Sequence, residues 1–239
     1  MPTPLLGDRR HGGAVRRSDR HRSRVTTPLP EHCNPGPRGG LQEVPWSVVS
    51  VNVGLPRTVE WEGKSVRTAI FKSPVDGVVH IGRYNLAGDQ QADPSVHGGE
   101  HKAVYLYPSE HYAYWRADLG DLVWGAFGEN LTTAGLTEDS VRIGDRLRVG
   151  SAELVVTQPR LPCFKLGIRF GRPGIEKRFL QSGLTGFYLS VTREGEVRAG
   201  DAVTVAERAI DSMTIAEAVR LYRTDRPDRE LLRRPSNFS

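Results

Sequence analysis

A cysteine near the middle of the chain is the clearest sign of chemistry in this sequence. Residues 158–166 read Gln-Pro-Arg-Leu-Pro-Cys-Phe-Lys-Leu and follow an apolar run that predicts a strand. Arg160 and Lys165 flank Cys163, and nearby cations lower the pKa of a thiol and favour the reactive thiolate. The two prolines fix φ and remove backbone donors, which argues against a helix running through the segment. A lone cysteine is also often a small buried apolar residue, so its residue type leaves both readings open.

Two polar stretches rich in glycine are the other candidates for a site. One reads His-Gly-Gly-Glu-His over residues 97–101, and the other reads Phe-Gly-Glu-Asn over residues 127–130. Glycines let a backbone approach a ligand closely and present N–H groups to anions. Glycine pairs also mark ordinary turns, and Glu129 is equally suited to capping a loop. The residue types favour surface or core positions for His101 and His111.

The cysteine and the histidines together could form two kinds of catalytic centre. Zinc fits poorly, because Cys163, His97 and His101 are not accompanied by a Cys-x-x-Cys pair or a helical His-x-x-x-His pair. A Cys–His hydrolase fits better, with Cys163 as nucleophile, His97 as base and backbone amides as the oxyanion hole. The sequence contains no P-loop and no Gly-x-Gly-x-x-Gly fingerprint.

Composition limits the classes of protein to which the chain can belong. It has 239 residues, 38% of them apolar, and no apolar run approaches the roughly 20 residues that span a bilayer. Its two cysteines, Cys33 and Cys163, cannot form a disulfide framework, which favours a reducing cytoplasmic compartment. Residues 1–44 hold eight arginines against four acidic residues and so account for most of the net charge of +5. The rest is nearly neutral, which argues against specific nucleic-acid binding and leaves non-specific contact of the basic segment with polyanions.

Mostly β structure with a few short helices is expected in the rest of the chain. Residues 1–44 lack apolar periodicity and cannot offset the entropy cost of ordering, so we expect them to be disordered. A hairpin is expected around Gly150-Ser151. The remaining patterns predict helices over residues 108–120 and 175–181, and strands over residues 46–53, 66–71, 77–82, 103–107 and 187–192.

A short repeat and a capping motif mark the end of the β-rich part. Val-Arg-Ile-Gly-Asp at residues 141–145 recurs as Val-Arg-Ala-Gly-Asp at residues 197–201, each before a β run. Two similar corner turns suit a small closed or nearly closed barrel. Thr-Ile-Ala-Glu at residues 214–217 is a capping box that opens a helix over residues 215–222, and Pro227 is expected to begin a second short helix.

Four motifs resemble the MOSC-domain proteins, a family named for the C-terminal domain of molybdenum cofactor sulfurases, and in particular its YiiM-like branch. The motifs span about residues 46–206 in the expected order: Gly-Asp-Gln-Gln-Ala-Asp at 88–93 with His-Gly-Gly at 97–99, Tyr-Pro-Ser-Glu-His-Tyr-Ala-Tyr-Trp at 107–115, Phe-Gly-Glu-Asn-Leu at 127–131, and the cysteine segment at 158–166. The resemblance implies a MOSC domain over residues 45–208 and a helical appendix over residues 209–239. That appendix resembles part of the three-helix domain that follows MOSC in this branch.

The resemblance implies a mostly β fold, a MOSC-type β-barrel with short peripheral helices, in which Cys163 lies in a pocket. It also implies the molybdenum cofactor, with Cys163 as the molybdenum ligand, and reduction of N-hydroxylated bases such as 6-hydroxylaminopurine. A thiolate is a soft ligand and suits such a centre. His97 would interact with an oxo or substrate oxygen or supply a proton. The remaining cofactor-binding residues implied are Gly98, Gly99 and Asn130 from the polar loops, and four cations for the pterin phosphate, Arg67, Lys72, Arg160 and Lys165.

Two alternatives stay open beside this reading. One is a sulfur-carrier protein that uses a Cys163 persulfide, and the other is the Cys–His hydrolase. A reductase of N-hydroxylated small molecules needs electrons, and the sequence shows no flavin or nicotinamide motif. We therefore expect a separate electron-donating reductase as partner. The sequence carries no sign of an oligomeric state.

Overall fold

The computed structural model describes residues 46–92 and 98–224. The chain divides into two units, Met1–Gln42 and Glu43–Ser239, and all described residues belong to the second. Three predictions concern residues outside the described ones. They are the disorder of residues 1–44, the role of His97 and the helix that begins at Pro227.

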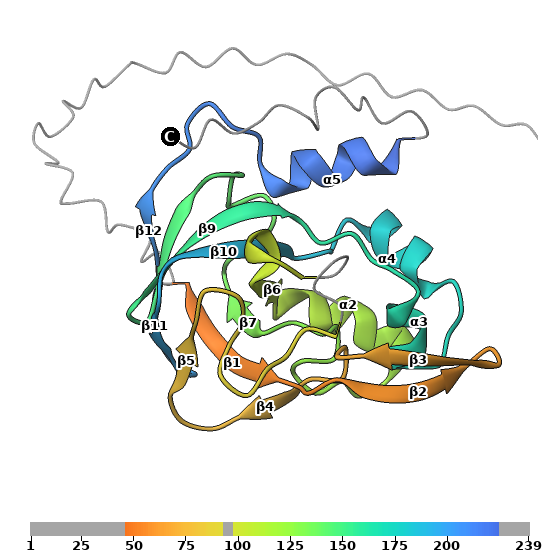
Figure 1. Cartoon of the computed structure of the whole chain (residues 1–239). Coiled ribbons are helices and arrows are strands. Elements are labelled where there is room, and N and C mark those ends of the chain that lie inside the picture. Colours follow the sequence, from red (N-terminus) through yellow and green to blue (C-terminus); the bar gives the residue numbers. More distant parts are fainter. Residues whose placement is uncertain (1–45, 93–97, 225–239) are drawn as a thin grey trace, which may run out of the picture. The chain divides into compact units, whose positions relative to one another are not determined.

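An eight-stranded sheet forms the body of the second unit (Figure 1). Its strands, in order across the sheet, are β12 (Val203–Glu207), β8 (Arg146–Val149), β9 (Ala152–Pro159), β10 (Phe187–Arg193), β6 (Val104–Pro108), β7 (Leu131–Ala134), β1 (Ser47–Val53) and β4 (Ser73–Val75). Neighbours are antiparallel except β6 and β7, which are parallel. Two further pairs complete the β structure, β5 (Val79–Ile81) with β11 (Gly195–Val197) and β2 (Arg57–Trp61) with β3 (Lys64–Thr68).

The expected mostly β structure with a few short helices is confirmed, but the barrel is not, because no closed barrel forms among the described residues. Among the described residues, the strands near the two edges of the sheet, β12 and β1, meet only where β1 begins. They are joined there by a bridge between Ser47 and Ala202 and by hydrogen bonds such as Val203 N to Trp46 O at 2.7 Å. Farther along, the edge of β1 is occupied by β4, with Val51 opposite Val75. The ladder between β12 and β1 therefore cannot continue, and the sheet stays open.

The repeated motif forms two equivalent turns, as the sequence predicts. The Oδ2 atom of Asp145 accepts from Arg142 N at 2.9 Å, and the Oδ2 atom of Asp201 accepts from Arg198 N at the same distance. Each aspartate thus closes its own turn through a backbone amide. The turns lead into β8 and β12, which pair with each other.

The helices differ from the sequence prediction mainly around the cysteine. The expected helix over residues 108–120 is α2 (Glu110–Leu119), and α4 (Ile175–Ser182) matches the second one. An unexpected short helix, α3 (Lys165–Phe170), begins two residues after Cys163. It agrees with the prediction that no helix crosses the prolines, because it starts only after them. Within α3, Gly167 packs closely, since a Cβ there would lie 3.1 Å from Arg172 O.

The hairpin β2–β3 was only partly predicted. The expected strand over residues 66–71 is β3, which ends at Thr68, and β2 was missed. Both strands carry many exposed polar residues, and they pair with each other rather than with the main sheet. Figure 1 shows this two-stranded ribbon on the side where α2, α3 and α4 gather.

Two apolar clusters hold these elements together. A mainly aliphatic cluster packs on the sheet and includes Val51, Leu106, Leu131, Leu147, Leu154 and Phe187. An aromatic cluster lies between α2, α3, α4 and β6 and includes Tyr105, Tyr107, Tyr112, Trp115, Phe127 and Phe179. Burying each such side chain is favourable by about 1.5–3 kcal/mol, so the aromatic cluster fixes the wall on which the site is built.

The described part of the chain ends in helix α5 (Ile215–Arg223). Its predicted capping box is present, because Glu217 N donates to Thr214 Oγ1 at 3.1 Å and Thr214 N donates to Glu217 Oε2 at 2.7 Å. Among the described residues, no helix is long and apolar enough to cross a membrane.

Candidate functional site

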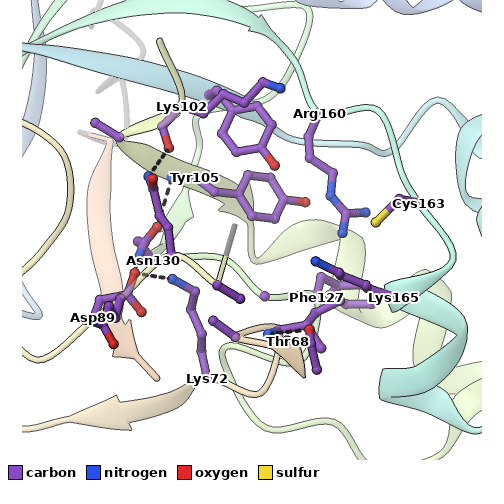
Figure 2. Close-up of a pocket in the computed structure, with 18 residues that line it drawn as sticks. Thr68, Lys72, Asp89, Lys102, Tyr105, Phe127, Asn130, Arg160, Cys163 and Lys165 are labelled. Carbon is purple, nitrogen blue, oxygen red and sulfur yellow. Dashed lines mark hydrogen bonds and ion pairs between the residues drawn. The ribbon is translucent and has the colours of Figure 1, made fainter. Parts of the chain in front are cut away.

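One pocket brings together most of the residues that the sequence singled out (Figure 2). It encloses about 110 Å³ and receives side chains from the exit of β3, from the loop before η1 (Glu100–Lys102), from β6, from the loop before β7, from the segment after β9 and from β10. The residues that line it are Thr68, Ala69, Ile70, Lys72, Asp89, Gln90, Gln91, Ala92, Lys102, Ala103, Tyr105, Phe127, Gly128, Asn130, Arg160, Cys163, Lys165 and Tyr188.

Cys163 lies on the wall between β9 and α3. Its side chain is half-buried and the thiol is free. The carbonyl of Cys163 accepts from Leu166 N at 2.9 Å, so the first turn of α3 fixes its backbone. Figure 2 shows the sulfur beside the guanidinium of Arg160. A thiol held at a pocket wall next to a cation has the setting of a reactive thiol or a metal ligand.

Arg160 is the most unusual cation of the pocket. It is 5% exposed, and its guanidinium carbon lies 5.3 Å from the ring centre of Tyr105 and 5.1 Å from that of Phe179. Burial lowers the pKa of Arg160, but Tyr105, Tyr188 and Cys163 together raise it above the ordinary value. Its Nη1 atom is buried and has no hydrogen-bond partner among the described residues. A buried charged donor without an acceptor is costly, so this atom points to an anionic ligand.

Lys72 and Asp89 form a second charged group on the opposite part of the pocket lining. Lys72 Nζ lies 2.5 Å from Asp89 Oδ2, and the two side chains are 9% and 3% exposed. Burial lowers the pKa of Lys72, while Asp89 opposes that shift. Asp89 also accepts from Asn130 Nδ2 and from Gly54 N, each at 2.9 Å. The charge of Lys72 is therefore compensated by Asp89, whereas Arg160 has no ion pair within residues 46–92 and 98–224.

Glu129 organises the loop that supplies Phe127, Gly128 and Asn130 to the pocket. It is fully buried, and its carboxylate accepts from the backbone N–H groups of Gly125 at 2.9 Å and Phe127 at 3.1 Å. It also accepts from Thr132 Oγ1 at 2.9 Å and from the hydroxyl of Tyr112. Burial raises the pKa of Glu129 despite these donors. Of the two roles weighed from sequence, the structure supports the loop cap.

The structure brings together five of the predicted site residues, Lys72, Asn130, Arg160, Cys163 and Lys165. Arg67 is exposed on β3 and is not part of the pocket lining. Gly98 and Gly99 also lie outside the lining, and Gly99 N donates to Gln91 Oε1 at 3.1 Å. His97 lies outside the described residues. His111 is buried against Glu138, with 2.7 Å between Nε2 and Oε2, in agreement with a core position.

Among the lining residues that sequence reasoning missed, four have charged or phenolic side chains: Asp89, Lys102, Tyr105 and Tyr188. The signal for Asp89 is its place in the polar motif at residues 88–93. The tyrosines gave no signal, since they read as ordinary strand residues of β6 and β10. The hydroxyl of Tyr105 donates to Thr185 O at 2.8 Å.

The donor set of the pocket fits the molybdenum cofactor. Cys163 offers a soft sulfur ligand, and Arg160 Nη1 offers a buried donor to an anion. The enclosed volume is smaller than the roughly 150 Å³ cavity that holds one benzene. The pocket would therefore enclose only part of a pterin cofactor, and the rest would extend beyond it.

Known proteins that are similar to this chain point to the MOSC-domain family. The MOSC domain model matches residues 93–204. The chain is 43% identical over 182 residues to the uncharacterized protein YflK of Bacillus subtilis, covering 76% of this chain and 82% of that protein. It is 41% identical over 161 residues to the protein YiiM of Escherichia coli, covering 66% and 70%.

A solved structure and a longer relative extend the comparison. The crystal structure of YiiM from Geobacillus stearothermophilus matches with a TM-score of 0.65 at 37% identity, covering 79% of this chain and 89% of that one. A protein of Gibberella moniliformis named "Reductase" is 36% identical over 168 residues, which are 67% of this chain but 29% of that protein. Most of that longer protein therefore has no counterpart in the matched region.

Proposed function

Because this chain belongs to the MOSC-domain family, in the branch of YflK and YiiM, we propose that it is a molybdenum-cofactor-dependent reductase of N-hydroxylated purines and related compounds. The observation that carries the proposal is the placement of Cys163 beside Arg160 in one pocket, with Arg160 Nη1 buried and unpartnered among the described residues. The pocket thus combines a soft sulfur ligand, which suits a metal, with a buried charged donor, which suits an anionic group of the cofactor.

In this proposal the residues of the chain have separate roles. Cys163 binds the metal through its thiolate, and Arg160 and Lys165 bind the phosphate of the pterin as charge-assisted donors. When bound, the cofactor supplies the metal through which electrons reach the N-hydroxylated substrate. Tyr105, Phe127 and Tyr188 form aromatic walls that exclude water from the reacting end.

Electrons come, in this proposal, from a separate reductase. The relative of Gibberella moniliformis that is named "Reductase" contains the matched region as 29% of its length. Such a protein has room for further domains in the same chain, which supports the idea that this domain works together with an electron donor. We propose that the present protein meets its donor as a separate polypeptide.

The test is expression in a host that makes the cofactor, followed by metal, pterin and activity measurements. We expect molybdenum and pterin in a one-to-one ratio with the protein, and reduction of 6-hydroxylaminopurine when a chemical electron donor is added. Protein that carries the cofactor but leaves 6-hydroxylaminopurine and other N-hydroxylated bases unchanged would overturn the reductase proposal.

A sulfur-carrier protein is the second candidate. The half-buried Cys163 beside the Arg160 guanidinium suits an anionic persulfide as well as a metal-bound thiolate. Cyanide-labile sulfur on Cys163 in protein free of molybdenum, without reductase activity, would favour this candidate. The Cys–His hydrolase depends on His97, which lies outside the described residues, and we do not propose it.

A further inference from the structure

The pair formed by Lys72 and Asp89 has no role in the function proposed so far. Both side chains line the pocket of Cys163, yet the charge of Lys72 is compensated by Asp89, which makes Lys72 a poor partner for a phosphate. We propose that Lys72 is the proton donor for cleavage of the substrate N–O bond and that Asp89 is its positioning residue. This inference rests on the proposed reductase function.

The geometry around Lys72 allows its ammonium group to donate a hydrogen bond to a ligand in the pocket. Its Nζ atom is 2.5 Å from Asp89 Oδ2, and an ammonium carries three N–H bonds. Within residues 46–92 and 98–224, Asp89 is the only acceptor of this ammonium group, so N–H bonds remain for a ligand in the pocket. Figure 2 shows Lys72 reaching into the pocket with its nitrogen beside Asp89.

Asp89 is held in place from three directions. Its Oδ1 atom accepts from Gly54 N at 2.9 Å, and its Oδ2 atom accepts from Lys72 Nζ and from Asn130 Nδ2. The backbone of Asp89 is fixed as well, since Asp89 N donates to Leu86 O at 3.0 Å. An ionised carboxylate that is fixed in this way fixes the ammonium bound to it.

The electrostatic surroundings suit a donor that releases its proton. Burial lowers the pKa of Lys72, and the carboxylates that face it, Asp89 and Glu129, oppose the shift without cancelling it. A general acid works best when its pKa lies near the working pH. Arg160, by contrast, keeps its proton at all physiological pH values and can only bind.

The proposed step balances in atoms and charge. Reduction of R–NHOH to R–NH₂ consumes two electrons and two protons and releases water. The separate reductase supplies both electrons. As the N–O bond breaks, the ammonium of Lys72 passes one proton to the hydroxyl oxygen, which leaves as water, and solvent supplies the second proton to the nitrogen. The neutral amine of Lys72 then takes a proton from solvent.

The main test replaces Lys72 by arginine, which keeps the cation opposite Asp89 but does not release a proton. In cofactor-loaded protein, we expect Lys72→Arg to lower kcat for 6-hydroxylaminopurine by about 100-fold or more, with molybdenum content unchanged. Lys64→Arg, at an exposed lysine of β3, is the matched control and should keep the wild-type rate. A wild-type kcat and pH profile in Lys72→Arg would overturn the inference while leaving the reductase function intact.

A second variant tests the positioning role of Asp89. Asp89→Asn removes a charge that raises the pKa of Lys72, so the alkaline limb of the pH–rate profile should move to lower pH. A residue that only supports the fold would lower the rate at every pH without moving the limb. An unmoved limb in this variant would therefore overturn the role assigned to Asp89.

An NMR measurement on metal-free protein tests Lys72 without activity. In protein labelled with ¹³C in lysine, the Lys72 signal, assigned by its absence in Lys72→Arg, should titrate below those of exposed lysines. Titration together with the exposed lysines would overturn the inference. If loaded wild-type protein does not reduce any N-hydroxylated base, the proposed function fails, and the role of Lys72 fails with it.

Discussion

The guanidinium of Arg160 lies beside the sulfur of Cys163, and its Nη1 atom is buried without a hydrogen-bond partner among the described residues. The free thiol of Cys163 and a guanidinium with one unsatisfied buried nitrogen therefore line the same pocket. The fold maintains this unsatisfied donor at a cost to its own stability. A bound anion would remove that cost.

The first prediction concerns Arg160. Arg160→Met removes the buried donor, and loss of a hydrogen bond to a charged group is worth about 1.5–3 kcal/mol, or about 10- to 100-fold in affinity. We expect the molybdenum content after gel filtration to fall to a small fraction of that of the wild type. Arg148→Met, an exposed position on β8, is the control. Full molybdenum content in Arg160→Met would show that Arg160 does not hold the cofactor.

A second prediction concerns the stability of the buried pair. Asp89→Asn leaves Lys72 buried without its counter-charge, and breaking a buried pair in this way costs about 3–5 kcal/mol. The double variant Lys72→Met, Asp89→Asn removes both charges and should recover part of that loss. Urea unfolding of metal-free protein at neutral pH measures both. Equal losses of unfolding free energy in the single and double variants would show that Lys72 and Asp89 are not energetically coupled.

The pH dependence of stability gives a third prediction. The pKa of Lys72 is lowered on folding from its ordinary value of about 10.4, so between the two values the unfolded chain binds more protons than the folded one. The contribution of Lys72 to the free energy of unfolding must therefore rise with pH across this window. The contribution of Lys72 is the free energy of unfolding of the wild type minus that of Lys72→Met, measured at each pH. A difference that falls as pH rises would show that the pKa is not lowered.

A fourth prediction tests the loop cap at Glu129. In Glu129→Gln, one carboxylate oxygen becomes an amide N–H₂ group, so a buried N–H of Gly125 or Phe127 loses its acceptor. An unsatisfied buried donor costs about 1–3 kcal/mol of stability. Glu60→Gln, at an exposed position of β2, serves as control. A change in unfolding free energy within about 0.5 kcal/mol, as for an ordinary surface substitution, would contradict the capping role of Glu129.

Local patterns predicted much of the fold and part of the site. The helix at residues 108–120, the strand at 187–192 and the capping box at Thr214 depend on nearby residues, and each is present with small shifts of its ends. The cysteine segment was equally readable, because Arg160, Cys163 and Lys165 lie within six residues of one another.

Non-local pairing explains what the sequence did not reveal. The open sheet results from β4 taking the edge of β1, which no local pattern indicates. The pairing of Lys72 with Asp89 joins residues 17 positions apart, and so Lys72 read as one more free cation for a phosphate. Strand β2 was missed because its exposed polar residues lack the apolar alternation of a half-buried strand.

The most direct measurement is the ratio of molybdenum to protein in three forms purified from a cofactor-producing host: wild type, Cys163→Ala and Cys33→Ala. Cys33 is the other cysteine of the chain and controls for loss of a thiol. We expect the wild type and Cys33→Ala to carry molybdenum in a one-to-one ratio with the protein, and Cys163→Ala to lose nearly all of it. Stoichiometric molybdenum in Cys163→Ala would contradict the assignment of Cys163 as the metal ligand.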